Sequence, residues 1–119
     1  MKKIVLFFSL FLITISVTAQ EKKKKNAKLL FEVDGVCMMC KERIEKAALN
    51  TKGVKYANWD VKTHELVVII DERKTSEQLV CQSMASAGHD TKHIKAPQDA
   101  YDNLHPCCKY RDEEVKKNH

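Results

Sequence analysis

The chain has 119 residues, of which 44% are hydrophobic, and a formal net charge of +5. This length suits one small domain with a single hydrophobic core, and so mild a positive charge does not indicate nucleic-acid binding. Because the five cysteines are an odd number, a framework made only of intramolecular disulfides is excluded.

The first 19 residues have the pattern of a secretory signal peptide. Two lysines precede an apolar run at 4–17, and small residues follow up to Ala19. The run is short for a bilayer span, so we expect cleavage near Ala19 and a periplasmic or secreted protein. The mature chain then has 19 basic and 16 acidic residues, a net charge of +3. It begins with a basic leader at 20–27, which we expect to be disordered.

The mature chain alternates between two apolar periods, one typical of strands and one typical of helices. The predicted elements are a strand at 29–33, a helix at 40–52, strands at 57–61 and 65–71, a helix at 75–87 and a weaker strand at 91–96. Gly53 and Gly88 end the two helices, and Thr75 with Gln78 has capping-box spacing. The order βαββαβ predicts an α+β, ferredoxin-like sandwich over 28–96, in which a four-stranded antiparallel sheet carries two helices on one face.

The second face of this predicted sheet is expected to be open. Leu30, Val67 and Ile69 point toward it, because alternate residues of a strand face opposite sides of the sheet. Such an apolar patch needs a cover. We expect the patch to be covered either by a second copy of the chain, in a homodimer, or by the C-terminal tail, residues 97–119. In the second case the tail is expected to form a short helix at 99–104.

Cys37 and Cys40 form a CxxC motif between the first strand and the first helix. Two thiols at this spacing either hold a soft metal ion or form a reversible disulfide. The helix N-terminus, with Lys41 and Arg43 nearby, is expected to lower the pKa of the Cys40 thiol and to favour the thiolate.

The chain resembles the heavy-metal-associated domain family over residues 28–96. The resemblance rests on the segments 34–40, 53–54 and 87–90. The family includes copper chaperones, the metal-binding modules of copper-pumping ATPases and periplasmic mercury-binding proteins. One departure is visible in the CxxC loop, where Val36 alone separates Gly35 from Cys37, whereas the family usually shows Gly-Met-x-Cys.

The resemblance implies a non-enzymatic protein that binds a soft metal ion through Cys37 and Cys40. Cu(I) is the expected ion, and Hg(II), Ag(I) and Zn(II) are alternatives. The protein would sequester the ion or pass it by ligand exchange to a partner, such as a metal-transporting ATPase or an efflux component.

Several further side chains are candidate auxiliary ligands. In the resembling fold, the loop with His89 returns to the CxxC end of the sheet, so His89 is either a third ligand or gate, or a surface histidine. Met38 either coordinates through its thioether, as its neighbour Met39 also could, or one of these two methionines packs under the loop and the other is exposed. In the tail, His105, Cys107 and Cys108 either join the CxxC pair, form a separate site, link two molecules or form a disulfide.

Two other function classes fit the same cysteines. One is a thiol–disulfide redox protein with Cys37 as its nucleophile. The Gly-Pro typical of thioredoxin-like enzymes is replaced by Met38 and Met39, and Pro97 and Pro106 both lie in the tail. The second class is an assembly protein that dimerises through the open sheet face or the tail cysteines. The remaining cysteine, Cys81, is expected to be an inert buried thiol.

Overall fold

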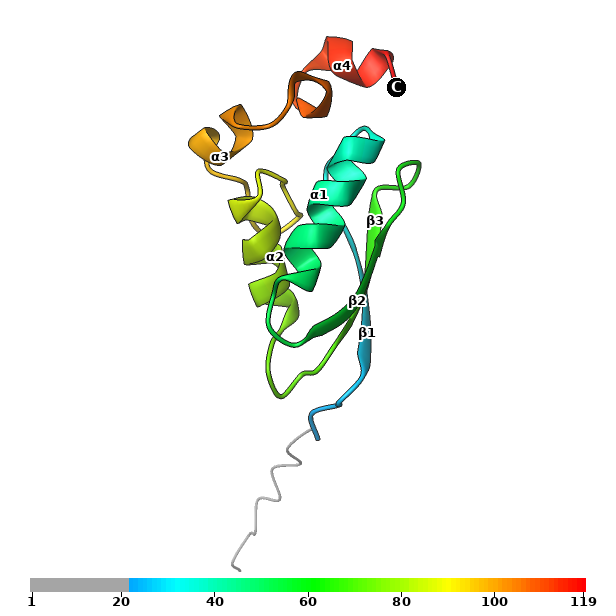
Figure 1. The fold of residues 1–119 in the computed structure, drawn as a ribbon, viewed down its shortest axis with the longest axis vertical. Coiled ribbons are helices and arrows are strands. Elements are labelled where there is room, and N and C mark those ends of the chain that lie inside the picture. Colours follow the sequence, from blue (N-terminus) through cyan, green and yellow to red (C-terminus); the bar gives the residue numbers. More distant parts are fainter. Residues whose placement is uncertain (1–21) are drawn as a thin grey trace, which may run out of the picture.

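The computed structural model describes residues 22–119 (Figure 1). The predicted signal peptide lies outside these residues. The elements are β1 (Ala27–Glu32), α1 (Met38–Leu49), β2 (Val54–Trp59), β3 (Glu65–Ile70), α2 (Glu77–Ser86), α3 (Gln98–Asp102), the 3-10 turn η1 (Pro106–Cys108) and α4 (Glu113–Lys117). No helix within this part of the chain is long and apolar enough to cross a membrane.

The three strands form one antiparallel sheet in the order β1-β3-β2. In the register of the sheet, Val68 of the central strand lies between Leu29 of β1 and Ala57 of β2. Helices α1 and α2 lie side by side on one face (Figure 1). The buried core between these layers includes Ile44, Ala48, Leu66, Val68, Ile70, Val80 and Met84. The two apolar periods of the sequence therefore meet in one core, as an α+β sandwich requires.

The fourth strand of the prediction is reduced to one isolated bridge, between Val33 and Thr91. The backbone N–H of Thr91 donates to the carbonyl of Ile94 at 2.9 Å, and the Asp90 carboxylate accepts from the Ala96 N–H at 2.7 Å. Because these groups bond within their own turn, they are not free to extend a ladder. The described part of the chain therefore contains a three-stranded sheet.

The end of the predicted disordered leader is held against the sheet. The N–H of Glu72 donates to the carbonyl of Lys24 at 2.9 Å, and Lys55 Nζ donates to Asn26 Oδ1 at 2.7 Å. Ala27, expected to be the last leader residue, is buried and begins β1. These two contacts, one between backbone groups and one from a side chain, hold residues 24–26 beside the sheet, and the strand begins at the last residue of the expected leader.

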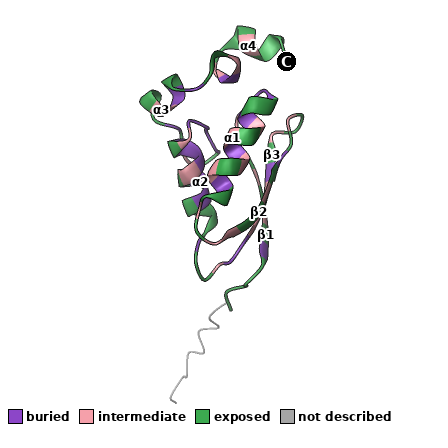
Figure 2. Ribbon diagram, in the orientation of Figure 1, coloured by how far each residue is buried: buried purple, intermediate pink, exposed green. Residues whose placement is uncertain are grey.

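The tail packs over the end of the sandwich where α1 begins, and not on the open sheet face (Figure 1). Its helix forms at Gln98–Asp102, close to the predicted range. Its Tyr101, Leu104, Cys108 and Tyr110 are buried, and Figure 2 shows buried stretches in α3 and η1. On the open face, Leu30 remains 57% exposed. The apolar cover expected for the sheet is thus placed at the CxxC end of the domain.

Candidate metal centre

The CxxC motif lies where β1 gives way to α1. Cys37 has extended backbone angles and is the N-cap of α1, and Cys40 lies in the first helical turn. The N–H of Lys41 donates to the Cys37 carbonyl at 3.1 Å, which closes this turn. Gly35 is needed just before it, since a Cβ there would lie 2.9 Å from the Trp59 ring. The resulting turn places the two Sγ atoms 3.5 Å apart.

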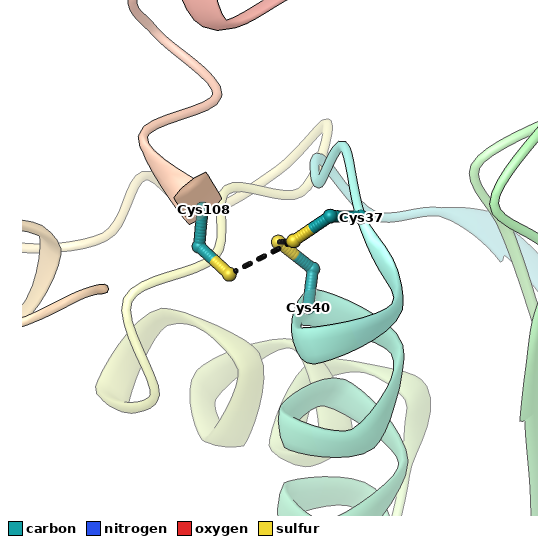
Figure 3. A group of neighbouring side chains, drawn as sticks. All are labelled: Cys37, Cys40 and Cys108. Carbon is teal, nitrogen blue, oxygen red and sulfur yellow. Dashed lines mark hydrogen bonds between the residues drawn. The ribbon is translucent and has the colours of Figure 1, made fainter. Parts of the chain in front are cut away.

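A third sulfur reaches this pair from the tail. Cys108 Sγ lies 3.2 Å from Cys37 Sγ, and the Sγ atoms of Cys37, Cys40 and Cys108 all lie within 4.8 Å of one another (Figure 3). Cys40 and Cys108 are fully buried, and Cys37 is 9% exposed. All five cysteines are free thiols. The three sulfurs form a compact, water-poor group of soft ligands, referred to below as the three-sulfur group.

The three thiols differ in their readiness to ionise. Burial raises the pKa of Cys37, but hydrogen bonds from the Cys108 thiol and from the N–H and thiol of Cys40 outweigh it, so its pKa is lowered. Burial raises the pKa of Cys40 and of Cys108. The sequence-based expectation for Cys40 is therefore wrong in direction. Lys41 does not assist, because its Nζ donates to Asn58 Oδ1 at 2.9 Å and to the Trp59 carbonyl at 2.8 Å.

Cys107 lies at the outer side of the three-sulfur group. Its Sγ is 3.8 Å from Cys37 Sγ and 3.3 Å from Met39 Sδ. His105 Nδ1 lies 3.7 Å from the same Sγ. Of the two methionines between the cysteines, Met38 is 60% exposed and Met39 is 42% exposed. The thioether that approaches a cysteine is thus that of Met39, on the next residue of α1.

His89 is a core residue. It is fully buried, its Nδ1 lies 2.8 Å from the Asp34 carbonyl oxygen, and its ring stacks on Tyr110 with centroids 5.6 Å apart. Its Nε2 is buried without a hydrogen-bond partner among the described residues. Burial lowers the pKa of His89 to about 4. Its Nδ1 contact and its stacking connect the CxxC loop with the tail, and His89 does not belong to the three-sulfur group.

Three tail residues hold Cys108 in place. The Tyr110 hydroxyl donates to the Gly88 carbonyl at 2.7 Å and accepts from the Asp90 N–H at 2.9 Å. The Arg111 guanidinium pairs with the Asp90 carboxylate at 2.7 Å and lies 4.2 Å over the Tyr101 ring. Buried, paired groups of this kind fix orientation, because leaving either partner unmatched is costly. The tail is therefore anchored on the loop that follows α2.

No motif or periodicity in the sequence points to Tyr110 or Arg111 as functional residues. Their one indirect signal is the loop at 87–90, which bears part of the family resemblance and which both residues contact. A tyrosine and an arginine in a charged tail have no periodicity of their own. Their role appears only when the tail folds back.

The fold and the paired thiols define a small α+β domain with a CxxC motif at a helix N-terminus. The heavy-metal-associated domain matches residues 30–90, which is just over half of the chain. The chain therefore belongs to the heavy-metal-associated domain family. The match ends at residue 90, so the tail with Cys107 and Cys108 lies beyond it.

The CopZ metallochaperone and a domain of a potential copper-translocating ATPase have a similar fold. The CopZ metallochaperone is 24% identical, with a TM-score of 0.53 over 55% of this chain and 98% of that one. The N-terminal domain of a potential copper-translocating P-type ATPase from Bacillus subtilis, in its Cu(I)-loaded state, is 25% identical, with a TM-score of 0.53 over 62% and 92%. Oxidized MerP from Ralstonia metallidurans CH34 is 26% identical, with a TM-score of 0.49 over 56% and 96%. No curated protein sequence matches the chain.

Proposed function

We propose that this protein binds Cu(I) through Cys37 and Cys40 and either sequesters the ion or passes it to a partner by thiolate exchange. The observation that carries the proposal is the 3.5 Å separation of the two Sγ atoms at the start of α1. Thiolate pairs prefer soft ions such as Cu(I), Ag(I) and Hg(II), whereas Mg²⁺ and Ca²⁺ prefer oxygen ligands.

Further support comes from the acidity of one thiol and from the relatives. The lowered pKa of Cys37 provides a thiolate at lower pH than an ordinary cysteine, and binding needs deprotonated sulfur. The Bacillus subtilis relative is described as Cu(I)-loaded. We propose a thiol-bearing acceptor as partner, such as a metal-transporting ATPase or an efflux component, and no catalytic chemistry on the ion.

The proposed cellular location rests on the N-terminal sequence. Residues 1–19 have the charge and apolar pattern of a signal peptide, so we propose export to the periplasm or the medium. In an oxidising compartment the thiols must stay reduced to bind metal. The lowered pKa of Cys37 also suits a redox nucleophile, and a thiol–disulfide redox protein is therefore the second candidate function.

One titration separates these functions. Reduced mature protein is titrated anaerobically with Cu(I), Zn(II) and Hg(II), beside a Cys37→Ser, Cys40→Ser double variant. A Cys81→Ser variant is the matched control, since Cys81 is a buried thiol on α2. We expect Cu(I) binding to be lost only in the double variant. Equal Cu(I) affinity in the double variant would refute the site, and rapid disulfide exchange without metal binding would favour the redox function.

A further inference from the structure

We propose that Cys108 is the third thiolate of the metal site, so that the ion is held by Cys37, Cys40 and Cys108 and leaves only when the tail releases it. The inference rests on the proposed function, in which the CxxC pair holds the ion. It adds a ligand from outside the matched domain, because Cys108 lies 18 residues beyond the end of the match at residue 90.

The spacing of the sulfurs fits three ligands better than two. With a metal–sulfur bond of about 2.3 Å, two sulfurs in a linear arrangement lie about 4.6 Å apart, and sulfurs in a trigonal arrangement lie about 4.0 Å apart. The Sγ atoms of Cys37 and Cys40 lie 3.5 Å apart, and those of Cys37 and Cys108 lie 3.2 Å apart. Moving the three sulfur atoms apart to the trigonal spacing requires only small side-chain movements. A linear two-sulfur site would require a larger separation of the CxxC pair and would leave Cys108 beside the ion.

The position of Cys108 is fixed by the tail itself. Its N–H donates to the His105 carbonyl at 2.8 Å, and its carbonyl accepts from the Tyr110 N–H at 2.7 Å. Tyr110 is anchored in turn through its hydroxyl to Gly88 and Asp90. The sulfur is therefore presented by a turn with paired backbone groups on both sides, which is the preorganisation that a ligand needs.

Simple core packing accounts poorly for this arrangement. A buried cysteine can pack as a small apolar side chain, but packing alone does not require three sulfur atoms to lie within 4.8 Å of one another. Figure 3 shows the side chains of Cys37, Cys40 and Cys108 converging on a common point from α1 and from η1. Convergence of soft ligands from two distant segments is the geometry that a shared ion requires.

Cys107 is an internal comparison for this role. It is the neighbour of Cys108 and is also close to Cys37, at 3.8 Å between Sγ atoms. However, it is only partly buried, and it does not belong to the three-sulfur group. Its sulfur contacts Met39 Sδ on the outer side. If any tail thiol could serve as the ligand, replacing either Cys107 or Cys108 would weaken metal binding. The proposed role predicts that only replacement of Cys108 does so.

A third ligand changes the transfer step. A thiolate of the acceptor forms a bond to Cu(I) while the bond from Cu(I) to Cys108 Sγ breaks, and the released thiolate takes a proton from water. Copper stays Cu(I), so no oxidant or reductant is involved. Because the tail must release the ion before a two-thiolate acceptor receives it, Cys108 increases retention and slows transfer.

The coordination number of the Cu(I)-loaded wild-type protein tests the inference directly. X-ray absorption at the copper edge is expected to give three sulfur neighbours in the reduced mature protein and in Cys107→Ser, and two in Cys108→Ser. In competition with a Cu(I) chelator, Cys108→Ser is expected to bind at least about ten-fold more weakly, since even indirect changes around a metal commonly cost that much. Transfer to a two-thiolate acceptor domain should be faster in Cys108→Ser and unchanged in Cys107→Ser.

Two sulfurs in the wild-type protein would overturn the inference, whether or not Cys108→Ser folds. Unchanged affinity in a folded Cys108→Ser protein would overturn it as well, with folding checked by circular dichroism. Failure of the proposed function looks different: the wild type then binds no Cu(I), or the double variant of Cys37 and Cys40 binds it equally well. The two failures are therefore distinguishable in one set of samples.

Discussion

The Sγ atoms of Cys37 and Cys108 lie 3.2 Å apart, although 71 positions separate the two residues in the chain. Cys37 belongs to the matched domain, and Cys108 belongs to the tail beyond it. Their contact depends on the anchoring of the tail to the loop after α2. A change in that anchoring should therefore alter metal binding even when the CxxC pair is intact.

Gly88 is the first position where this dependence is testable. Its φ is +99°, and a Cβ there would lie 2.8 Å from the Ala100 carbonyl oxygen of α3. Gly88→Ala therefore combines a left-handed backbone with a clash against the tail. We expect a loss of about 1–3 kcal/mol in the free energy of unfolding, measured in urea. We also expect weaker Cu(I) binding, measured by chelator competition.

Gly53 provides the matched control. Gly53 lies in the turn between α1 and β2, at the far end of the domain (Figure 1). Its φ is +91°, and an added Cβ would lie 2.9 Å from Lys74 Cβ. Gly53→Ala should lose comparable stability and keep the Cu(I) affinity of the wild type under conditions where both proteins are folded. An equal loss of affinity in both variants would mean that the metal responds to general destabilisation and not to the tail.

Tyr110 supplies the second test, because its hydroxyl satisfies two backbone groups. Tyr110→Phe leaves the Gly88 carbonyl and the Asp90 N–H without their partner in a buried place. We expect a loss of about 1–3 kcal/mol in the free energy of unfolding. Tyr56→Phe on the open face, where the residue is 48% exposed, is the control and should be neutral. Urea unfolding of the metal-free proteins measures both, and equal stabilities would contradict the assigned role of the hydroxyl.

The sandwich and the CxxC position follow from local signals in the sequence. The alternation of apolar and polar residues around Leu29 predicts a strand, and the helical spacing of apolar residues around Ile44 predicts a helix. The structure contains both elements. The strand expected at 91–96 is absent because its groups bond within a turn around Asp90. Whether such a segment forms a turn or pairs as a strand depends on its tertiary contacts. One of these contacts is the ion pair between Arg111 and the Asp90 carboxylate.

Local sequence patterns do not predict that the three-sulfur group forms. The sequence makes Cys108 a candidate, together with His89, His105 and Cys107, but spacing carries no information about where a tail folds back. The structure places Cys108 against Cys37 and buries His89 in the core. The deciding contacts are those of Tyr110, a residue with no sequence pattern of its own.

His89 predicts how stability depends on pH. Its pKa is about 4 in the folded protein, against an ordinary value of 6.5, because burial disfavours the charged ring. Between these values the unfolded chain binds more protons, so stability is full above pH 6.5 and falls as the pH decreases toward 4. The loss attributable to His89 is about 3 kcal/mol at its limit.

Asn at this position isolates the effect. The side-chain amide of His89→Asn can still donate to the Asp34 carbonyl, as Nδ1 does at 2.8 Å, but it does not titrate. Asp34 has a pKa raised by burial and by the nearby Asp90 charge, and it acts in the opposite direction in both proteins. Urea unfolding of the metal-free proteins from pH 4 to 7 should show the steeper decrease in the wild type. Parallel curves would remove His89 as the cause.

Arg111 determines how firmly the tail is held. Its guanidinium donates to both Asp90 carboxylate oxygens, at 2.7 and 3.1 Å, and to the Ala96 carbonyl at 3.1 Å. Arg111→Gln leaves Asp90, whose side chain is only 12% exposed, without its cation. We expect faster amide hydrogen exchange at 98–111 with little change in β3, since local opening exposes the segment that loses its anchor.

A second ion pair of the same kind is the control for Arg111→Gln. Arg73 donates through Nε and Nη2 to the two carboxylate oxygens of Asp71, at 2.9 and 2.8 Å, in the segment that follows β3. Arg73→Gln also leaves a nearly buried carboxylate, since the Asp71 side chain is 2% exposed. It should leave exchange in the tail unchanged. If both variants accelerate exchange in the tail equally, the tail follows global stability, and Arg111 is not its specific anchor.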